Sequence, residues 1–308
     1  MSVLIELAVG DPHADTRHVS LADAETIAEI AQELGAKGLW LVDRADGRIA
    51  LDPSVVGSRL AGRYGGLAYA IDAPTTRNAP YNLARRVLSF DRATERGVGL
   101  VLRPGTGDEV SDAVAPDPQA TEPAERWSEY VDILTALWES FPREALLGDQ
   151  EAAVVADDAR IRPINHDGRF YRVAGPLDGP ASAQGRPAVL VADTAALGWE
   201  RVAAVADAVI VDEADIAGAD GALTAALEAA GRSRADVALL ARIDGSGDPV
   251  RLQQWASESG VDGFVLAPTG DPASIVDVVR RVVPALAPST RTPLRVALRR
   301  PESTEVGA

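Results

Sequence analysis

The stretch GPLDGPASAQGRPAVLVADTAALG, residues 175–198, contains the local pattern that decides the fold of this chain. Its glycine- and proline-rich start leads into an apolar run at residues 188–192, which predicts a buried strand. A short turn follows, and a helix is expected to begin near Ala195. Strand–turn–helix junctions present backbone N–H groups to phosphate in βα folds. Thr194 and Gly198 suit such an anion site, whereas the negative charge of Asp193 would oppose it.

The same alternation of short apolar runs with longer amphipathic runs extends along the 308 residues and predicts eight strands and eight helices. The strand runs lack regular polar alternation, as expected for a parallel sheet that is covered on both faces. Eight βα units match the size of a (β/α)8 barrel, and an open doubly wound sheet is the alternative. The expected strands are residues 3–9, 38–42, 67–71, 98–102, 188–192, 208–211, 237–243 and 263–266, and the expected helices are residues 21–34, 53–63, 81–93, 124–140, 195–206, 219–230, 250–259 and 273–286.

Two long segments interrupt this alternation. Residues 103–122 are polar and rich in proline and glycine, which predicts a long loop after the fourth strand. Residues 141–187 form a second excursion, in which NHDGRFYRVAG (165–175) predicts a small hairpin before the fifth strand. Loops that follow barrel strands lie at the active-site face, so these segments would border the site. We expect one barrel domain over residues 1–288 and a C-terminal tail over residues 289–308.

The composition excludes several classes of function. Lys and Arg total 30 against 46 Asp and Glu, and the net charge of −16 argues against nucleic acid or an anionic membrane as a partner. The chain has no cysteine, which excludes disulfides and thiolate chemistry, and its three histidines are too scattered to predict a metal site. The start MSVLIELAVG has neither a basic region nor a long apolar run, so we expect a cytoplasmic protein.

Polar residues at the ends of the expected strands are the candidates for binding. Asp43 follows the second strand, where a structural carboxylate at the barrel mouth is the simpler interpretation. Thr75, Thr76 and Arg77 follow the third strand and could bind an anion, although threonine before a helix is often an N-terminal cap. Arg103 follows the fourth strand in a glycine-rich run that lacks phosphate-loop spacing.

Two further patterns favour structural roles. His166 lies in NHDG, whose residue types are typical of a tight turn. Trp127, Tyr130, Trp138 and Phe141 recur at near-helical spacing, which predicts a stripe facing the core. Chain order and spacing do not establish a Ser-His-Asp triad, so the catalytic residues stay unassigned.

Several longer motifs occur in order along the chain: PYNLARRVLSFD (80–91), LTALWES (134–140), INHDGRFYRVAGPL (164–177), QGRP (184–187), ADAVIV (206–211) and VDGFVLAP (261–268). In this combination the chain resembles the nitrilotriacetate and dibenzothiophene-sulfone monooxygenase group of the bacterial luciferase-like flavin-dependent oxidoreductases. The resemblance implies a (β/α)8 barrel that binds reduced flavin mononucleotide (FMN) at the carboxyl ends of its strands. It also implies a separate flavin reductase, oxidation of a small organic substrate by dioxygen, and a homodimer or a heterodimer with a related barrel.

The resemblance places Thr75 and Thr76 beside the flavin and Gly198 near its phosphate. The family pattern G-W-N-V-V-T-S reads GLVLRPG at residues 99–105, and Q-A-G-x-S reads VADTA at residues 191–195. Each lost hydrogen bond to a charged phosphate weakens binding by about 1.5–3 kcal/mol. Arg103 could replace lost neutral donors with a cation, and Thr194 could replace the missing serine. The cofactor-binding candidates are Thr75, Thr76, Arg103, Asp193, Thr194 and Gly198.

These departures leave three functions open, because a fold does not settle a function. The first is a flavin-dependent monooxygenase with a remodelled phosphate site. The second is a non-catalytic barrel with a degenerate flavin site that serves as a partner subunit. The third is a barrel enzyme that uses a deazaflavin or no flavin.

Overall fold

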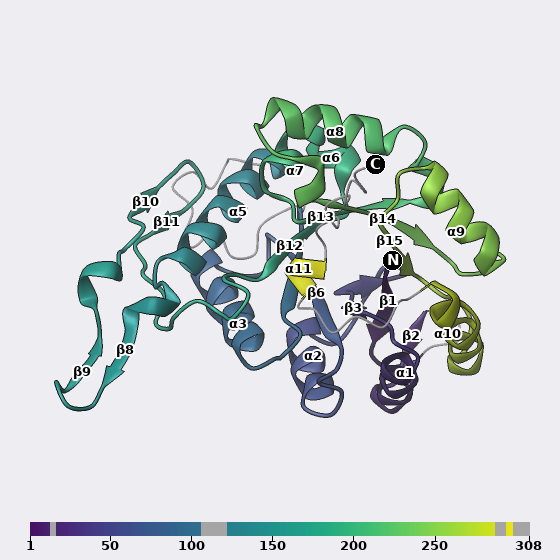
Figure 1. Ribbon diagram of the computed structural model, residues 1–308, viewed down its shortest axis with the longest axis horizontal. Helices are drawn as coiled ribbons and strands as arrows, with labels where there is room; N and C mark the ends of the chain where they lie inside the picture. Colours follow the sequence, from purple (N-terminus) through teal and green to yellow (C-terminus); the bar gives the residue numbers. More distant parts are fainter. Residues whose placement is uncertain (13–16, 106–121, 287–293, 298–308) are drawn as a thin grey trace, which may run out of the picture.

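The computed structural model describes residues 1–12, 17–105, 122–286 and 294–297. Eight parallel strands form a closed barrel, because the last strand also pairs with the first, with Val3 opposite Phe264 (Figure 1). This closure confirms the predicted (β/α)8 barrel, and the open sheet is wrong. The barrel strands are β1 (Ser2–Val9), β3 (Gly38–Leu41), β6 (Ala68–Pro74), β7 (Val98–Arg103), β12 (Ala188–Val191), β13 (Ala208–Asp212), β14 (Ala238–Ile243) and β15 (Gly263–Leu266).

Helices surround the barrel and begin at recognisable caps. Ser20 accepts the N–H of Asp23, and Asp52 and Asp248 cap the helices that begin at the prolines following them. The helix predicted over residues 195–206 is divided at Gly198, whose φ of 76° is outside the helical range. The helices are α1 (Leu21–Glu33), α2 (Pro53–Ala61), α3 (Pro80–Arg92), α5 (Pro123–Glu139), α6 (Thr194–Leu197), α7 (Trp199–Val205), α8 (Ala219–Ala229), α9 (Pro249–Glu258), α10 (Pro272–Leu286) and α11 (Leu294–Ala297), with short 3-10 turns η1 (Arg143–Ala145), η2 (Asp158–Arg160), η3 (Glu213–Asp215) and η4 (Arg234–Asp236). Within the described parts of the chain, no helix is long and apolar enough to cross a membrane.

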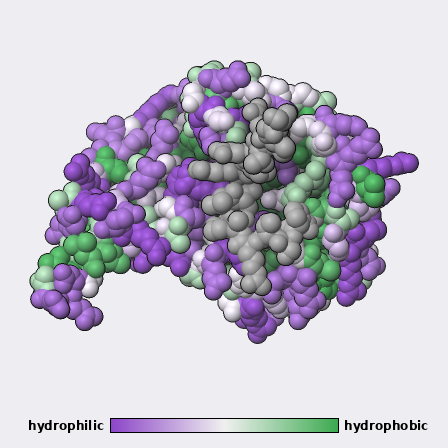
Figure 2. Space-filling view, viewed as in Figure 1, coloured by the Kyte–Doolittle hydropathy of each residue, from purple (hydrophilic) through white to green (hydrophobic). Residues whose placement is uncertain are grey.

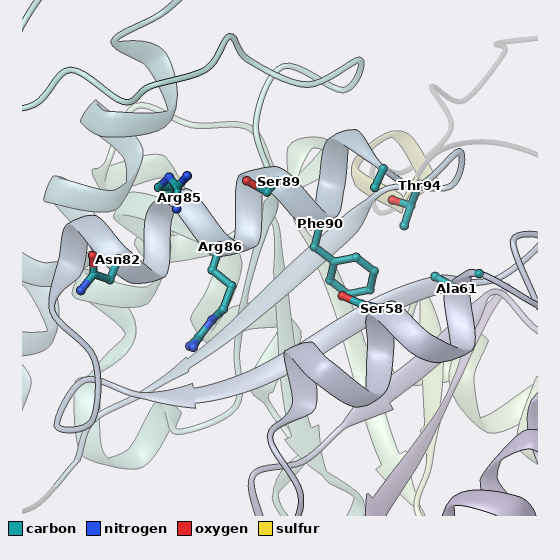
Figure 3. A pocket seen from close by; sticks show the side chains of 10 residues that line it. Ser58, Ala61, Asn82, Arg85, Arg86, Ser89, Phe90 and Thr94 are labelled. Atoms are coloured by element: carbon teal, nitrogen blue, oxygen red, sulfur yellow. The ribbon is translucent and has the colours of Figure 1, made fainter.

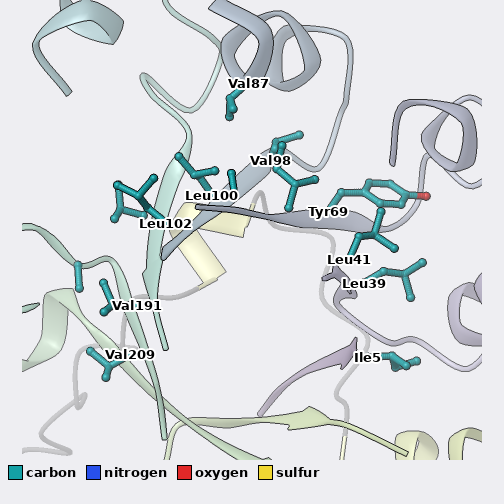
Figure 4. Close-up of a cluster of buried hydrophobic side chains, with 14 of the residues drawn as sticks. Ile5, Leu39, Leu41, Tyr69, Val87, Val98, Leu100, Leu102, Val191 and Val209 are labelled. Carbon is teal, nitrogen blue, oxygen red and sulfur yellow. The ribbon is translucent and has the colours of Figure 1, made fainter. Parts of the chain in front are cut away.

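The strand side chains divide the core into an outer and an inner layer, because successive residues point to opposite faces. The outer layer packs beneath the helices and includes Ile5, Leu39, Tyr69 and Leu100 (Figure 4). Trp127, Tyr130 and Trp138 of α5 are fully buried in the same layer, which confirms the predicted aromatic stripe for these three residues. The inner layer fills the barrel with Leu4, Trp40, Ala70, Val101, Leu190, Ile210, Leu240 and Val265.

The floor of the barrel is closed by a residue from the far end of the chain. Leu294 of α11 is fully buried within the inner layer, and its N–H donates to the carbonyl of Arg96 at 2.7 Å. Arg295 lies 3.3 Å from the carboxylate of Asp207. Part of the segment 289–308 therefore packs against the barrel, while the domain boundary after residue 288 stays a prediction.

The excursion before the fifth strand contains the predicted hairpin, formed by β10 (His166–Asp167) and β11 (Arg172–Val173). Glu129 of α5 anchors it, because its carboxylate accepts the N–H of Tyr171 at 2.8 Å and lies 2.9 Å from Nε2 of His166. The predicted loop after the fourth strand falls largely at residues 106–121, outside the described residues. Three minor strand pairs were not predicted: β2 (His18–Val19) beside β1, the β4 (Arg44–Ala45) and β5 (Arg48–Ile49) hairpin, and the β8 (Leu146–Asp149) and β9 (Val154–Ala156) hairpin.

The β8–β9 hairpin projects away from the barrel at the left of Figure 1. Its Leu147 and Val155 are 55% and 70% exposed, and the hairpin shows as a green apolar patch in Figure 2. Sequence periodicity missed this hairpin because apolar residues in a strand are expected to face a core, and these face solvent.

Candidate active site

The carboxyl ends of the barrel strands carry charged side chains in an otherwise apolar interior. Glu6 of β1 is 8% exposed, and its Oε1 accepts from Nη2 of Arg242 on β14 at 2.8 Å. Arg17 lies 3.5 Å from the same carboxylate. A buried charge is costly unless it is paired. The two arginines therefore neutralise the Glu6 carboxylate inside the closed barrel. The sequence offered a signal for them, since Glu6 and Arg242 interrupt apolar strand runs.

Arg103 joins two carboxylates on the opposite part of the mouth. Its Nε lies 3.2 Å from Oδ2 of Asp193, and its Nη1 lies 3.7 Å from Oδ1 of Asp72. Burial alone would lower the pKa of Arg103, but the neighbouring charges of Asp72 and Asp193 raise it. Asp193, whose charge we expected to oppose an anion, is therefore paired with a cation.

Asp72 of β6 is the most enclosed acid at the mouth, with 5% of its surface exposed. Its Oδ2 accepts the N–H of Asp43 at 3.2 Å, and its Oδ1 has no hydrogen-bond partner among the described residues. Burial raises the pKa of Asp72 to about 7, against the opposing effect of Arg103. Sequence reasoning missed this residue, although a charge inside the apolar run of residues 67–74 was visible.

The predicted threonines hold two strand-end loops together. Thr75 donates its N–H to the carbonyl of Arg103 at 3.0 Å, and its Oγ1 accepts the N–H of Gly105 at 3.2 Å. Thr76 packs against Gly105 so closely that a Cβ at position 105 would overlap its hydroxyl. Neither threonine caps α3, whose N-cap is Ala79. Thr75 therefore links the ends of β6 and β7 by hydrogen bonds, and Thr76 packs against the same connection.

Asp43 and Arg77 form a bridge between two cavities. Nη1 of Arg77 lies 2.9 Å from both carboxylate oxygens, and burial raises the pKa of Asp43 while Arg77 opposes that shift. Asp43, Asp72 and Arg77 line both a cavity of about 280 Å³ and a cavity of about 560 Å³. The larger cavity has four arginines and three aspartates in its lining: Arg17, Arg44, Arg77, Arg103, Asp43, Asp46 and Asp72.

The turn after β12 gives fewer donors than its sequence predicted. Helix α6 has four residues, and the N–H groups of Ala196 and Leu197 donate to the carbonyl of Asp193. The N–H of Gly198 donates to the carbonyl of Thr194 at 2.9 Å. The structure thus brings Thr75, Thr76, Arg103 and Asp193 together. The cofactor-binding roles of these four residues and of Thr194 and Gly198 stay predictions.

The turns after the last two barrel strands are less suited to an anionic ligand. Barrels commonly bind phosphate after the seventh and eighth strands, but here Asp244, Asp248 and Asp271 occupy those turns and accept the local N–H groups. A cavity of about 710 Å³ lies between α2 and α3, lined by Asn82, Arg85 and other residues (Figure 3). It belongs to the outer wall, away from the strand ends. Among the described residues, no group of three or more His, Asp or Glu side chains could hold a metal ion.

Solved structures share this fold over nearly the whole chain. A riboflavin lyase, solved with modified FMN and riboflavin, is 20% identical and superposes with a TM-score of 0.80 over 96% of this chain and 94% of its own. DmoA from Hyphomicrobium sulfonivorans is 19% identical, with a TM-score of 0.80 over 98% and 92% of the two chains. At these identities the likeness shows the fold.

Sequence comparison places the chain more narrowly. It is 29% identical over 227 residues to a subunit of pristinamycin IIA synthase from Streptomyces pristinaespiralis, covering 73% of this chain and 69% of that protein. It is 28% identical over 148 residues to dibenzothiophene-sulfone monooxygenase of Rhodococcus erythropolis, covering 47% of this chain but only 33% of that relative's length. The model of the luciferase-like monooxygenase family matches residues 1–244. The chain therefore belongs to the luciferase-like monooxygenase family.

Proposed function

We propose that this chain is a flavin-dependent monooxygenase of the two-component type. It takes reduced FMN from a separate reductase and uses dioxygen to oxidise a small organic substrate. The observation that carries this proposal is the 560 Å³ cavity, in which four arginines gather on a chain of net charge −16. Three aspartates offset most of this charge, so that the four arginines leave the lining with one formal positive charge in excess. On an acidic protein this excess favours an anionic ligand, and guanidinium groups bind phosphate well.

The residues at the mouth fit this cofactor. The cavity volume lies within the range of about 300–1,000 Å³ that is usual for small-molecule sites. Arg103 and Arg77 would bind anionic oxygens, and Thr76 would lie beside the flavin. Thr75 orients the backbone at Gly105, and Thr194 and Gly198 would lie near the phosphate. The bound flavin supplies the redox chemistry with dioxygen, while these residues bind and orient it.

The names of relatives support the same class of reaction. Dimethyl-sulfide monooxygenase of Hyphomicrobium sulfonivorans is 27% identical over 211 residues. Nitrilotriacetate monooxygenase component A of Aminobacter aminovorans is 29% identical over 148 residues, and its name implies a further component. An F420-dependent secondary alcohol dehydrogenase shares the fold with a TM-score of 0.69 at 12% identity, so a deazaflavin is tested beside FMN.

One observation favours a non-catalytic barrel as the second candidate. Arg17, Arg77, Arg103 and Arg242 each lie within 3.5 Å of a carboxylate oxygen, so the charges of the mouth are compensated without a ligand. A barrel of this kind would serve as a partner subunit. The relative from Streptomyces pristinaespiralis is likewise described as a subunit.

A binding titration separates the candidates. Oxidised FMN, anaerobically reduced FMN and F420 are titrated into the full chain, and flavin fluorescence or absorbance is followed. We expect reduced FMN to bind with a Kd of about 10 μM or tighter, which corresponds to about −7 kcal/mol. Arg103→Ala should weaken binding at least about tenfold, whereas Arg160→Ala on the exposed η2 should not.

Activity is then measured as flavin-dependent oxygen consumption with a supplied reductase. Absence of FMN binding at about 100 μM would leave only the non-catalytic barrel or a different cofactor. Binding of FMN together with oxygen consumption would exclude the non-catalytic barrel.

A further inference from the structure

Asp72, Arg103 and Asp193 form a cluster in which two carboxylates flank one guanidinium. Arg103 lies 3.7 Å from Asp72 and 3.2 Å from Asp193. When all three are ionised, the cluster carries one net negative charge. An anion that binds Arg103 would bring a third negative group to the same cation, so its binding is opposed unless one carboxylate loses its charge.

Asp72 is the carboxylate that can lose its charge most readily. Its side chain is 3% exposed, against 25% for Asp193. It accepts one hydrogen bond, from the N–H of Asp43 at 3.2 Å, while Asp193 contacts Arg103 through both of its oxygens at 3.2 and 3.3 Å. Burial raises the pKa of Asp72 to about 7, so the protonated form is accessible near neutral pH.

We infer that the mouth binds its anionic ligand together with one proton, which is taken up on Asp72. This inference rests on the proposed function, because it concerns the same cavity. The proton comes from solvent and forms one O–H bond on the Asp72 carboxyl. Asp72 is thus a positioning residue that acts through Arg103: once it is neutral, the guanidinium is held by one carboxylate rather than two and can turn to the ligand.

Charged groups face Asp72 from several elements of the mouth. Arg103 faces it from β7, Asp193 from the end of β12, and Asp43 with its partner Arg77 from the loops after β3 and β6. Glu6 on β1 also acts on Arg103 across the interior. Each of these surrounding groups is either paired at hydrogen-bond distance or partly exposed. The negative charge of the ligand therefore acts most strongly on Asp72, where it favours the protonated carboxyl.

The consequence is a specific pH dependence of binding. Ligand binding and protonation of Asp72 favour each other by the same factor. Above the pKa that Asp72 has in the protein without ligand, the affinity for FMN should fall by up to about tenfold per pH unit. Between pH 7 and pH 9 we expect the Kd for FMN to rise about tenfold or more in the wild type, and less than about twofold in Asp72→Asn.

Calorimetry measures the proton directly. Reduced FMN is titrated anaerobically into the full chain at pH 8 in two buffers with different ionisation enthalpies, and the difference in heat gives the protons taken up. We expect about 0.5–1 proton for the wild type beyond the uptake of Asp72→Asn, which retains the shape of the side chain. The FMN phosphate contributes equally to both. The control Asp212→Asn removes a charge from the opposite rim, where Asp212 is 58% exposed, and should retain the wild-type uptake.

The outcomes separate this inference from the proposed function. If the wild type binds FMN without taking up a proton, the inference is overturned and the proposed function stands. The inference is likewise overturned, and the proposed function stands, if Asp72→Asn takes up as many protons as the wild type on binding FMN. If the wild type does not bind FMN, the proposed function fails and the inference fails with it. The wild-type measurement decides the matter even if Asp72→Asn does not fold.

Discussion

Replacement of Asp193 by asparagine should strengthen the binding of FMN. Asp193 holds Arg103 through two contacts of 3.2 and 3.3 Å, in a pair whose side chains are 25% and 38% exposed. Asparagine keeps the shape of the side chain but removes its charge, so the guanidinium becomes available to a phosphate. The substitution therefore tests whether Arg103 is the cation that binds the cofactor.

The magnitude follows from the exposure of the pair. An ion pair this accessible to solvent contributes about 0.2–1 kcal/mol. The wild type must break this pair before Arg103 can bind a phosphate, whereas Asp193→Asn has no such pair to break. The gain therefore equals the contribution of the pair, and the affinity should be about 1.5- to 5-fold higher. The double variant Asp193→Gly, Ala195→Ser should also strengthen binding, since it removes the carboxylate and adds a neutral hydroxyl donor to the turn.

Flavin fluorescence titration at fixed pH and salt measures the change. The matched control is Asp178→Asn, which breaks a pair with Arg85 on the outer wall and should leave the Kd for FMN unaltered. Adding Arg103→Ala to Asp193→Asn should abolish the gain, because the gain acts through that guanidinium. An unchanged or higher Kd in Asp193→Asn would refute the assignment of Arg103.

Three further substitutions test the floor, the mouth and its buried acid. Leu294→Ala should lower the free energy of unfolding by about 2–5 kcal/mol in urea denaturation. The control Leu147→Ala, at a position that is 55% exposed, should change it by less than about 0.5 kcal/mol. Similar small losses in both variants would refute the packing of α11. Gly105→Ala should raise the Kd for FMN at least about threefold with an unchanged circular dichroism spectrum, because its Cβ would displace Thr76; an unaltered Kd would show that this contact is irrelevant to binding. Because the folded-state pKa of Asp72 is raised to about 7, its contribution to stability is present below about pH 4 and is lost as the pH rises to 7. Asp72→Asn should therefore gain stability relative to the wild type between pH 5 and pH 8 in urea denaturation, and a constant difference would contradict the raised pKa.

The sequence by itself determined the eight barrel strands and the main helices of this protein. Strand and helix signals depend on residues that are close in the chain, such as the apolar run at 188–192 and the cap at Ser20. The alternating run of residues 165–175 similarly predicted the β10–β11 hairpin. The turn predicted at NHDG (165–168) is wrong, because His166 and Asp167 pair within strand β10 and the connection lies at residues 168–171. The motif combination predicted the family, which the match over residues 1–244 confirms.

Only the tertiary structure decided which charges meet. Arg242 reaches Glu6 across 236 residues of sequence, and Arg103 reaches Asp193 across 90. Closure of the barrel brings these positions together, and no local pattern records which strand ends become neighbours. The sequence thus predicted Asp193 as an obstacle to an anion, whereas the fold pairs it with Arg103. Asp72 could be identified only from the tertiary structure. Burial within the barrel raises its pKa, and desolvation depends on how the interior packs around the carboxyl.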